Sequence, residues 1–171
     1  MPPGIQRGIT LHQRIDAFAD AHPAVGASNR RLVSANVGLR PAAAGIAVDM
    51  LYDHLLARDW PLYCTGVPLA AFAAGFYRTA AACTASLPPR VRFGLDLMRT
   101  EDWLTSYRDL SEIRAVLERI RRRLSPRAAA VSPLPVATAV FAEDPAGFEE
   151  DFARFWPEVM AYAAASVPRL E

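Results

Sequence analysis

The sequence GIAVDMLYDHLLA, residues 45–57, predicts a helix that is apolar on nearly every side. A helix of this kind is usually buried in the core of a protein. Yet it carries two carboxylates and an imidazole, from Asp49, Asp53 and His54. A buried carboxylate is normally neutralised, paired with a cation or bound to a metal ion. We therefore expect a functional centre on this helix.

The three polar residues lie close together on the predicted helix. Asp49 and Asp53 are four residues apart and share one face. His54 follows Asp53 at about 100° round the helix axis. An Asp-His pair alone is weak evidence for a metal site, because such pairs also occur at the exposed ends of helices. The apolar surroundings favour the metal site.

A second helix, residues 9–21, carries further candidates beside its apolar stripe. His12, Asp16 and Asp20 recur every four residues, and such positions lie on one face. His12 and Asp16 could also form only a surface pair, and Asp20 could shape the turn before Pro23. Carboxylate and imidazole ligands together suit manganese, iron or zinc, and carboxylates also accept magnesium. Such an ion can clamp a phosphate oxygen and activate water, which is the chemistry of phosphoester hydrolysis.

The remaining sequence predicts an all-α fold in one domain, residues 1–171. Hydrophobic periodicity and the positions of proline and glycine predict helices over residues 9–21, 24–37, 41–58, 67–87, 90–98, 111–124 and 145–165. Pro61 is expected to end the third of these helices, and Thr100 to cap another. Residues 126–144 form either a loop or an interrupted helix. No alternating strand pattern or glycine-rich phosphate loop is found.

Composition gives few further constraints. Hydrophobic residues make up 52% of the 171 residues, which is enough for a sizeable core. The formal net charge of +1 gives no general attraction to nucleic acid or membrane. Two cysteines are too few for a disulfide framework, and no signal peptide is evident. We expect a soluble, cytoplasmic protein, and its oligomeric state is left open.

Basic residues form one run, Arg121-Arg122-Arg123, at the end of a predicted helix. A solvated helix end is the simpler interpretation, since cations are favoured at that end by the helix dipole. The functional alternative is a docking patch for an acidic partner, to which Arg30 and Arg31 could contribute.

Several blocks of the sequence resemble the acyl carrier protein phosphodiesterase family. The most specific blocks are GITLHQRID at residues 8–16, DAHP at 20–23 and DMLYDHLLARDW at 49–60. Weaker resemblance is seen in WLTSYRD at 103–109 and FARFWP at 152–157. The similarity extends from about residue 3 to residue 162.

The resemblance implies a helical fold similar to that of HD-type metal phosphohydrolases. It implies hydrolysis of the phosphodiester that joins 4′-phosphopantetheine to a serine of holo acyl carrier protein. A divalent metal is implied as cofactor, manganese being favoured and magnesium or iron being alternatives. Carried over by position, His12, Asp53 and His54 are expected as metal ligands, and Asp49 and Asp16 as catalytic residues. The holo carrier protein is the expected partner, with Arg121–Arg123 as its contact.

The resemblance also implies a difference from the family at the N-terminus. Members begin with an additional segment that helps to form the metal site, which would leave the ligand set incomplete here. Weak metal binding, dimerisation or low activity would follow. Two other functions stay open: an HD-type phosphohydrolase acting on a nucleotide or another small phosphoester, and a non-catalytic helical protein that binds carrier protein.

Overall fold

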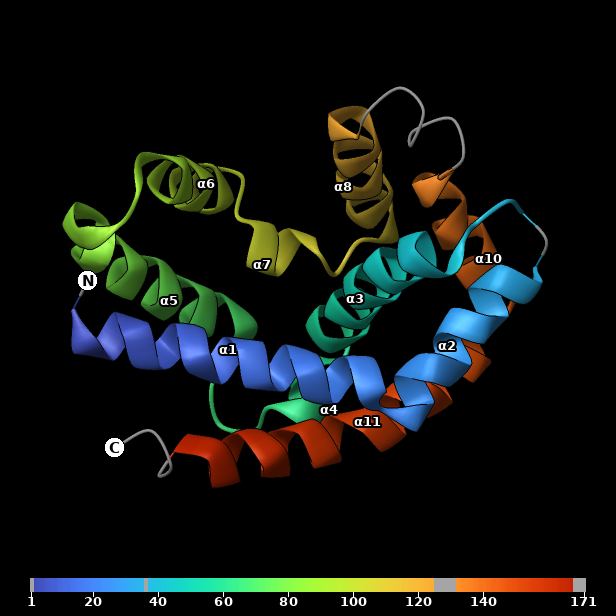
Figure 1. Ribbon diagram of the computed structural model, residues 1–171, viewed down its shortest axis with the longest axis horizontal. Coiled ribbons are helices and arrows are strands. Elements are labelled where there is room, and N and C mark those ends of the chain that lie inside the picture. Colours follow the sequence, from blue (N-terminus) through green and yellow to red (C-terminus); the bar gives the residue numbers. More distant parts are fainter. Residues whose placement is uncertain (1, 36, 125–131, 168–171) are drawn as a thin grey trace.

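The computed structural model describes residues 2–35, 37–124 and 132–167, and these ranges contain helices but no strand, which confirms the all-α prediction. The helices occur along the chain in the order α1 (Pro3–Ala21), α2 (Pro23–Ser34), α3 (Pro41–Arg58), α4 (Trp60–Tyr63), α5 (Leu69–Cys83), η1 (Thr84–Ser86), α6 (Pro89–Thr100), α7 (Trp103–Ser106), α8 (Leu110–Arg123), η2 (Leu134–Val136), α10 (Ala137–Glu143) and α11 (Pro145–Ser166). Figure 1 shows their arrangement.

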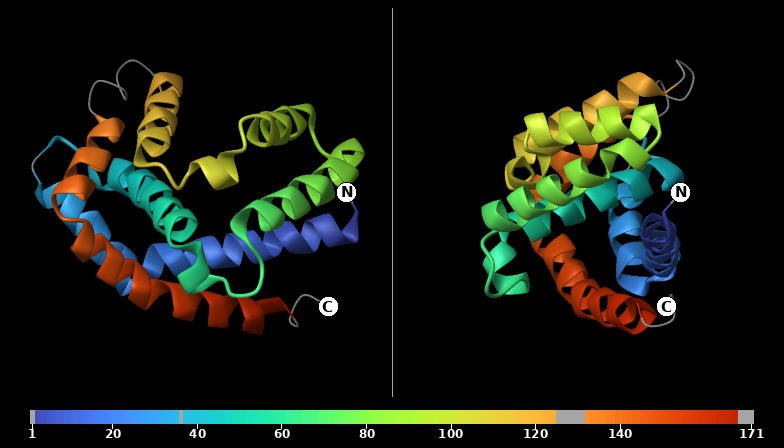
Figure 2. Two further views of the ribbon diagram at one scale, coloured as in Figure 1. Left: turned by 180° about the vertical axis from the view of Figure 1, so that it is seen from behind. Right: turned by 90° about the vertical axis from the view of Figure 1, so that its left-hand side faces the viewer.

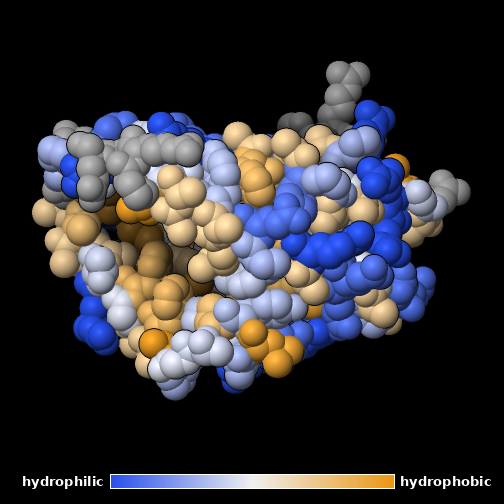
Figure 3. All heavy atoms as spheres, turned by 90° about the horizontal axis from the view of Figure 1, so that it is seen from below, coloured by the Kyte–Doolittle hydropathy of each residue, from blue (hydrophilic) through white to orange (hydrophobic). Residues whose placement is uncertain are grey.

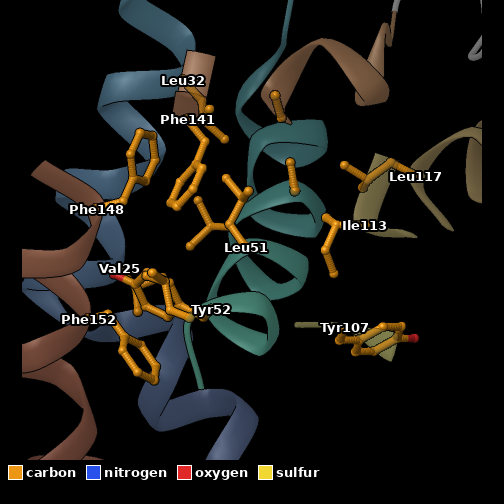
Figure 4. Packing of buried hydrophobic residues seen from close by; sticks show 14 of the residues in the cluster. Val25, Leu32, Leu51, Tyr52, Tyr107, Ile113, Leu117, Phe141, Phe148 and Phe152 are labelled. Atoms are coloured by element: carbon orange, nitrogen blue, oxygen red, sulfur yellow. The ribbon is translucent and has the colours of Figure 1, made fainter. Parts of the chain in front are cut away.

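Helix α3 lies at the centre of the fold, as its apolar sequence predicts. It contacts α2, α4, α8, α10, α11 and η2. Figure 4 shows side chains packed on two of its sides: Phe148 and Phe152 approach from one side, and Ile113 and Leu117 from the other. Leu51 is fully buried between them. The packing therefore covers α3 except along one narrow stripe.

A long layer of helices supports α3 from one side. Helices α1 and α11 lie side by side (Figures 1 and 2), and the rings of Phe18 and Tyr162 stack between them at 4.5 Å. Helix α2 packs on both α3 and α11. Helix α11 turns an aromatic face to the core, because Phe148, Phe152 and Phe155 are all buried.

Helices α5, α6 and α7 form an arm on the other side of α3 (Figure 1). Helix α6 buries none of its residues and contacts only its neighbours α5 and α7 closely. Near the end of the molecule where both termini lie, the surface is hollowed and apolar side chains line the hollow (Figure 3). The described residues include no helix that is long and apolar enough to cross a membrane.

The bounds predicted for the central helix, residues 41–58, are those of α3, but the roles predicted for Pro61 and Thr100 are wrong. Pro61 does not end α3, which stops at Arg58; the proline lies in the first turn of α4, where its missing N–H costs nothing. Thr100 does not cap a helix start. It is the last residue of α6, and its Oγ1 donates a hydrogen bond to the carbonyl of Asp96 at 2.8 Å. The residue before α7 is instead Asp102, in the left-handed region with φ 45°.

Other predicted bounds differ from the structure, and helix α1 begins at Pro3 rather than at residue 9. The helix expected over residues 67–87 is shorter and ends in the 3-10 turn η1. The helix expected over residues 24–37 ends at Ser34. Within the uncertain stretch 126–144, residues 134–143 form η2 and α10, and residues 126–131 lie outside the described residues.

Candidate functional site

The one stripe of α3 that packing leaves open carries its carboxylates. Ile46, Asp49 and Asp53 are exposed, whereas Val48, Leu51 and the other residues between them are buried or partly buried. The spacing of three and four residues places these open positions on one side of the helix. The sequence prediction that Asp49 and Asp53 share a face is confirmed, but the face meets solvent.

Helix α1 adds two more carboxylates to this side of the molecule. The charges of Asp16 and Asp20 both reach Asp49 and raise its pKa. We call Asp16, Asp20, Asp49 and Asp53 the acidic face. Asp20 had the alternative role of shaping the turn before Pro23. Its four-residue spacing from Asp16 predicted instead that both residues lie on one face of the helix. The neighbouring His22 caps α2, since its Nδ1 accepts a hydrogen bond from the N–H of Ala24 at 3.2 Å.

Two carboxyl groups of the acidic face, those of Asp49 and Asp53, have raised pKa values. Burial, followed by the charges of Asp20 and Asp16, raises the pKa of Asp49 to about 6. Burial, followed by the charge of Asp49, raises the pKa of Asp53 to about 7. Because both residues still touch solvent, water screens part of this effect. Carboxyl groups that titrate near neutrality can gain or lose protons at the pH of a cell, as catalytic acids and bases do.

Asp53 is one of the residues that line a small pocket between α3, α5 and α7. The pocket has a volume of about 70 Å³ and is otherwise lined mostly by apolar side chains. These side chains are Leu56, Ala57, Trp60, Leu69, Phe72, Leu104 and Tyr107. They surround the Asp53 carboxylate with protein on several sides although the residue is open to solvent. This position explains why burial is the main cause of its raised pKa.

Tyr107 joins the pocket to the buried imidazole of His54. Its ring lies beside α3, apart from the aromatic side chains of α11 (Figure 4), and burial and the charge of Asp53 raise its pKa to about 12. Its backbone carbonyl lies 2.9 Å from Nδ1 of His54. Nothing in the sequence signals this contact between Tyr107 and His54.

His54 is buried, and its ring meets the edge of Phe141 with 5.5 Å between centroids. Burial lowers its pKa, so the ring is neutral near pH 7. A carbonyl can only accept, so Nδ1 donates to Tyr107 and the lone pair lies on Nε2. An imidazole fixed in this way presents the nitrogen that a metal ion would bind.

The predicted ligands do not form a complete metal cage. Over the described ranges 2–35, 37–124 and 132–167, no three His, Cys, Asp or Glu side chains are grouped closely enough to hold a metal ion. His12 pairs with Asp16 at 3.3 Å, and both side chains are largely exposed. Asp49 and Asp53 nevertheless fit a hard divalent cation of the kind that one or two carboxylates bind together with water and phosphate oxygens. The ligand assignment for His12, Asp53 and His54 stays a prediction.

Two arginines of the run 121–123 are paired with a carboxylate of their own helix, α8. Arg121 forms two hydrogen bonds to Glu118, at 2.9 and 2.7 Å, and Arg122 lies 3.8 Å from the same carboxylate. Arg31 does not extend a surface patch, because it binds Asp144 and the buried Asp151. Partner binding by Arg121–Arg123 stays a prediction.

Comparison with known proteins identifies the family. The family model described as "Acyl carrier protein phosphodiesterase" matches residues 1–159. Proteins named acyl carrier protein phosphodiesterase from Salmonella dublin, Salmonella newport and Salmonella heidelberg are each 31% identical over 163 residues, which are 95% of this chain and 80% of theirs. No solved structure matches. The acidic face on α1 and α3 thus lies within the matched residues, and the chain belongs to the acyl carrier protein phosphodiesterase family.

Proposed function

We propose that this chain hydrolyses the phosphodiester between 4′-phosphopantetheine and a serine of a holo acyl carrier protein, which releases the apo carrier. The observation that carries the proposal is the acidic face, where Asp49 and Asp53 have raised pKa values and open to solvent beside a small apolar pocket. Family membership supplies the substrate class. The proposed substrate is a phosphodiester on a protein, so the reacting group must approach an open face.

The proposed reaction requires a divalent metal ion, with manganese favoured and magnesium or iron as alternatives. Such an ion would neutralise charge on the phosphate and lower the pKa of a water molecule. Asp53 would hold it, since carboxylate oxygens suit these hard cations. Repulsion among the carboxylates of the acidic face supports this role, because a cation would relieve it.

Side chains of the protein would supply the other functions that the reaction needs. Asp49, with a pKa raised to about 6, is suited to accept a proton from the attacking water. Burial is the main cause of this raised pKa, and the charges of Asp20 and Asp16 add to it. His54 anchors the backbone at Tyr107 and so keeps the pocket wall against α3. The apolar pocket keeps water away from one side of Asp53.

The test is to incubate the chain with a holo acyl carrier protein and Mn²⁺, and to weigh the carrier by mass spectrometry. We expect loss of the phosphopantetheine mass, and no loss when EDTA is present. A parallel assay with bis(p-nitrophenyl) phosphate tests the small-phosphoester alternative. Hydrolysis of that compound alone would overturn the carrier-protein substrate. Metal-independent binding of the carrier without hydrolysis would favour the non-catalytic alternative.

The raised pKa values also predict a pH-dependent effect on stability. A carboxyl group with a raised pKa in the fold stabilises the protein below its unfolded pKa, and this contribution is lost as pH rises through the folded value. For Asp53 that window runs from about 4 to about 7. Asp53→Asn, which cannot ionise, should therefore gain stability relative to the wild type between pH 5 and pH 8. Urea unfolding without metal measures this difference, and an equal difference at both pH values would contradict it.

A further inference from the structure

A second pocket lies between α5 and α6 and shares no lining residue with the pocket beside Asp53. It has a volume of about 520 Å³ and is open to solvent. Its lining residues come from the second half of α5, from η1 and from α6: Tyr77, Arg78, Ala81, Thr84, Arg92, Asp96 and Arg99. Figures 1 and 2 show α6 lying over α5 at the end of the molecule that holds the N-terminus. We call this the arginine pocket.

Three arginines line the arginine pocket. Arg78 comes from α5, while Arg92 and Arg99 come from α6, where Arg92, Asp96 and Arg99 follow the i, i+4, i+7 spacing of one helix face. None of the three arginines takes part in the ion pairs found among the described residues. Asp96 is the one acidic side chain in the lining, which leaves an excess of positive charge.

Packing does not explain this arrangement. Helix α6 buries none of its residues, so Arg92 and Arg99 are not placed by a core that requires them there. Elsewhere in the described chain, arginines such as Arg58, Arg119 and Arg121 lie against carboxylates. Guanidinium groups that share a pocket without such partners repel one another, and a bound anion would offset that repulsion.

We propose that the arginine pocket binds a small molecule that carries a phosphate monoester or diphosphate group. The planar guanidinium group donates paired hydrogen bonds that match phosphate oxygens. The volume of the pocket lies within the range of small-molecule sites, roughly 300–1,000 Å³. A concave site suits a compact ligand better than a flat protein face does. The proposal goes beyond the phosphodiesterase reaction and does not depend on it.

Removal of divalent cations distinguishes phosphate binding at the arginine pocket from phosphate binding at the acidic face. Without a divalent cation the acidic face repels a phosphate group, since its charged members are carboxylates. The arginine pocket needs no metal ion to attract one. Binding of a phosphate compound in the presence of EDTA therefore reports on the arginine pocket.

The test is isothermal titration calorimetry of the full chain with inorganic pyrophosphate and with inorganic phosphate, in EDTA and low salt. We expect one site per chain, with pyrophosphate bound more tightly. The double variant Arg92→Gln, Arg99→Gln should weaken pyrophosphate binding at least tenfold. Its helix buries nothing, so the variant should keep its circular dichroism spectrum and melting temperature. The matched control is Arg7→Gln, Arg114→Gln, which removes the same charge from exposed positions on α1 and α8 and should stay within twofold of wild type.

Three results would overturn the proposal. The first is no pyrophosphate binding by the wild-type chain. The second is equal weakening in the control and the test variant, because that pattern reports only net charge. The third is binding of a hepta-glutamate peptide more tightly than pyrophosphate with loss in the Arg92→Gln, Arg99→Gln variant, which would assign the surface to an acidic protein segment.

Discussion

Asp53→Asn is expected to lower kcat/KM for the phosphodiester by about 10³-fold, because asparagine keeps the size of the side chain but can neither accept a proton nor neutralise a cation. The variant should fold, since Asp53 is exposed to solvent and its ionised form is disfavoured in the fold. Steady-state hydrolysis of holo carrier protein with Mn²⁺ measures the effect. Glu150→Gln, an exposed position on α11 with the same change of charge, should keep wild-type activity.

Metal affinity decides which role Asp53 plays. If it is a ligand, Asp53→Asn should weaken Mn²⁺ binding in calorimetry along with activity. If it acts as the base, Mn²⁺ affinity should persist while kcat falls. Asp49→Asn, measured in the same way, should give the opposite result. It should keep Mn²⁺ affinity and lose kcat if Asp53 is the ligand, and it should weaken Mn²⁺ binding if Asp53 is the base. Activity within threefold of wild type for both variants would remove the acidic face from the mechanism.

The central helix could be predicted from sequence because its signal is local and strong. Residues 45–57 are apolar on nearly all sides, and the structure places α3 in the middle of the core with Pro41 and Arg58 at its ends, as expected. The pairing of Asp49 with Asp53 on one face follows from the helix period alone. These features depend on no distant part of the chain.

The neighbours of that face depend on tertiary contacts and were harder to predict. The carbonyl of Tyr107 contacts His54, which is 53 positions away in the chain. The hydrophobic periodicity of a helix cannot predict such a contact. Thr100 satisfied the residue preference for a helix start, yet the chain there was ending a helix, because threonine can also donate to the carbonyl one turn back. Arg31 was assigned to the surface because its partner, Asp151, is 120 positions away.

Asp151 is the most consequential residue that sequence reasoning missed. Its side chain is fully buried on α11. Its Oδ2 accepts hydrogen bonds from Ser28 Oγ at 3.1 Å and from Arg31 Nε at 3.2 Å, and its Oδ1 accepts one from Arg154. The hydroxyl of Ser28 also lies 3.0 Å from that of Tyr52 on α3. One carboxylate thus joins α2 to α11 and, through a serine, to α3.

Asp151→Ala is expected to lower the free energy of unfolding by about 1–3 kcal/mol, the usual cost of leaving a buried hydrogen-bonding group without its partner. The substitution leaves Ser28 short of an acceptor in the core and removes a partner of Arg31. Asp151→Asn should cost less, because the amide keeps the volume and one acceptor. Urea unfolding monitored by circular dichroism, with the slope compared between variants, measures both.

Arg154→Ala provides the contrast that tests this explanation. Arg154 binds the same carboxylate, but its side chain is 57% exposed, whereas that of Asp151 is 0% exposed. Water can replace an exposed partner, so this variant should lose less than about 1 kcal/mol. If Asp151→Ala and Arg154→Ala lost equal stability, the ion pair between Asp151 and Arg154 would account for the effect. If Asp151→Ala lost less than about 1 kcal/mol, the buried carboxylate would not stabilise the contact of α2 with α11. The asymmetry we expect arises because removal of Asp151 leaves the buried Ser28 hydroxyl without its acceptor, whereas removal of the exposed Arg154 leaves no such group in the core.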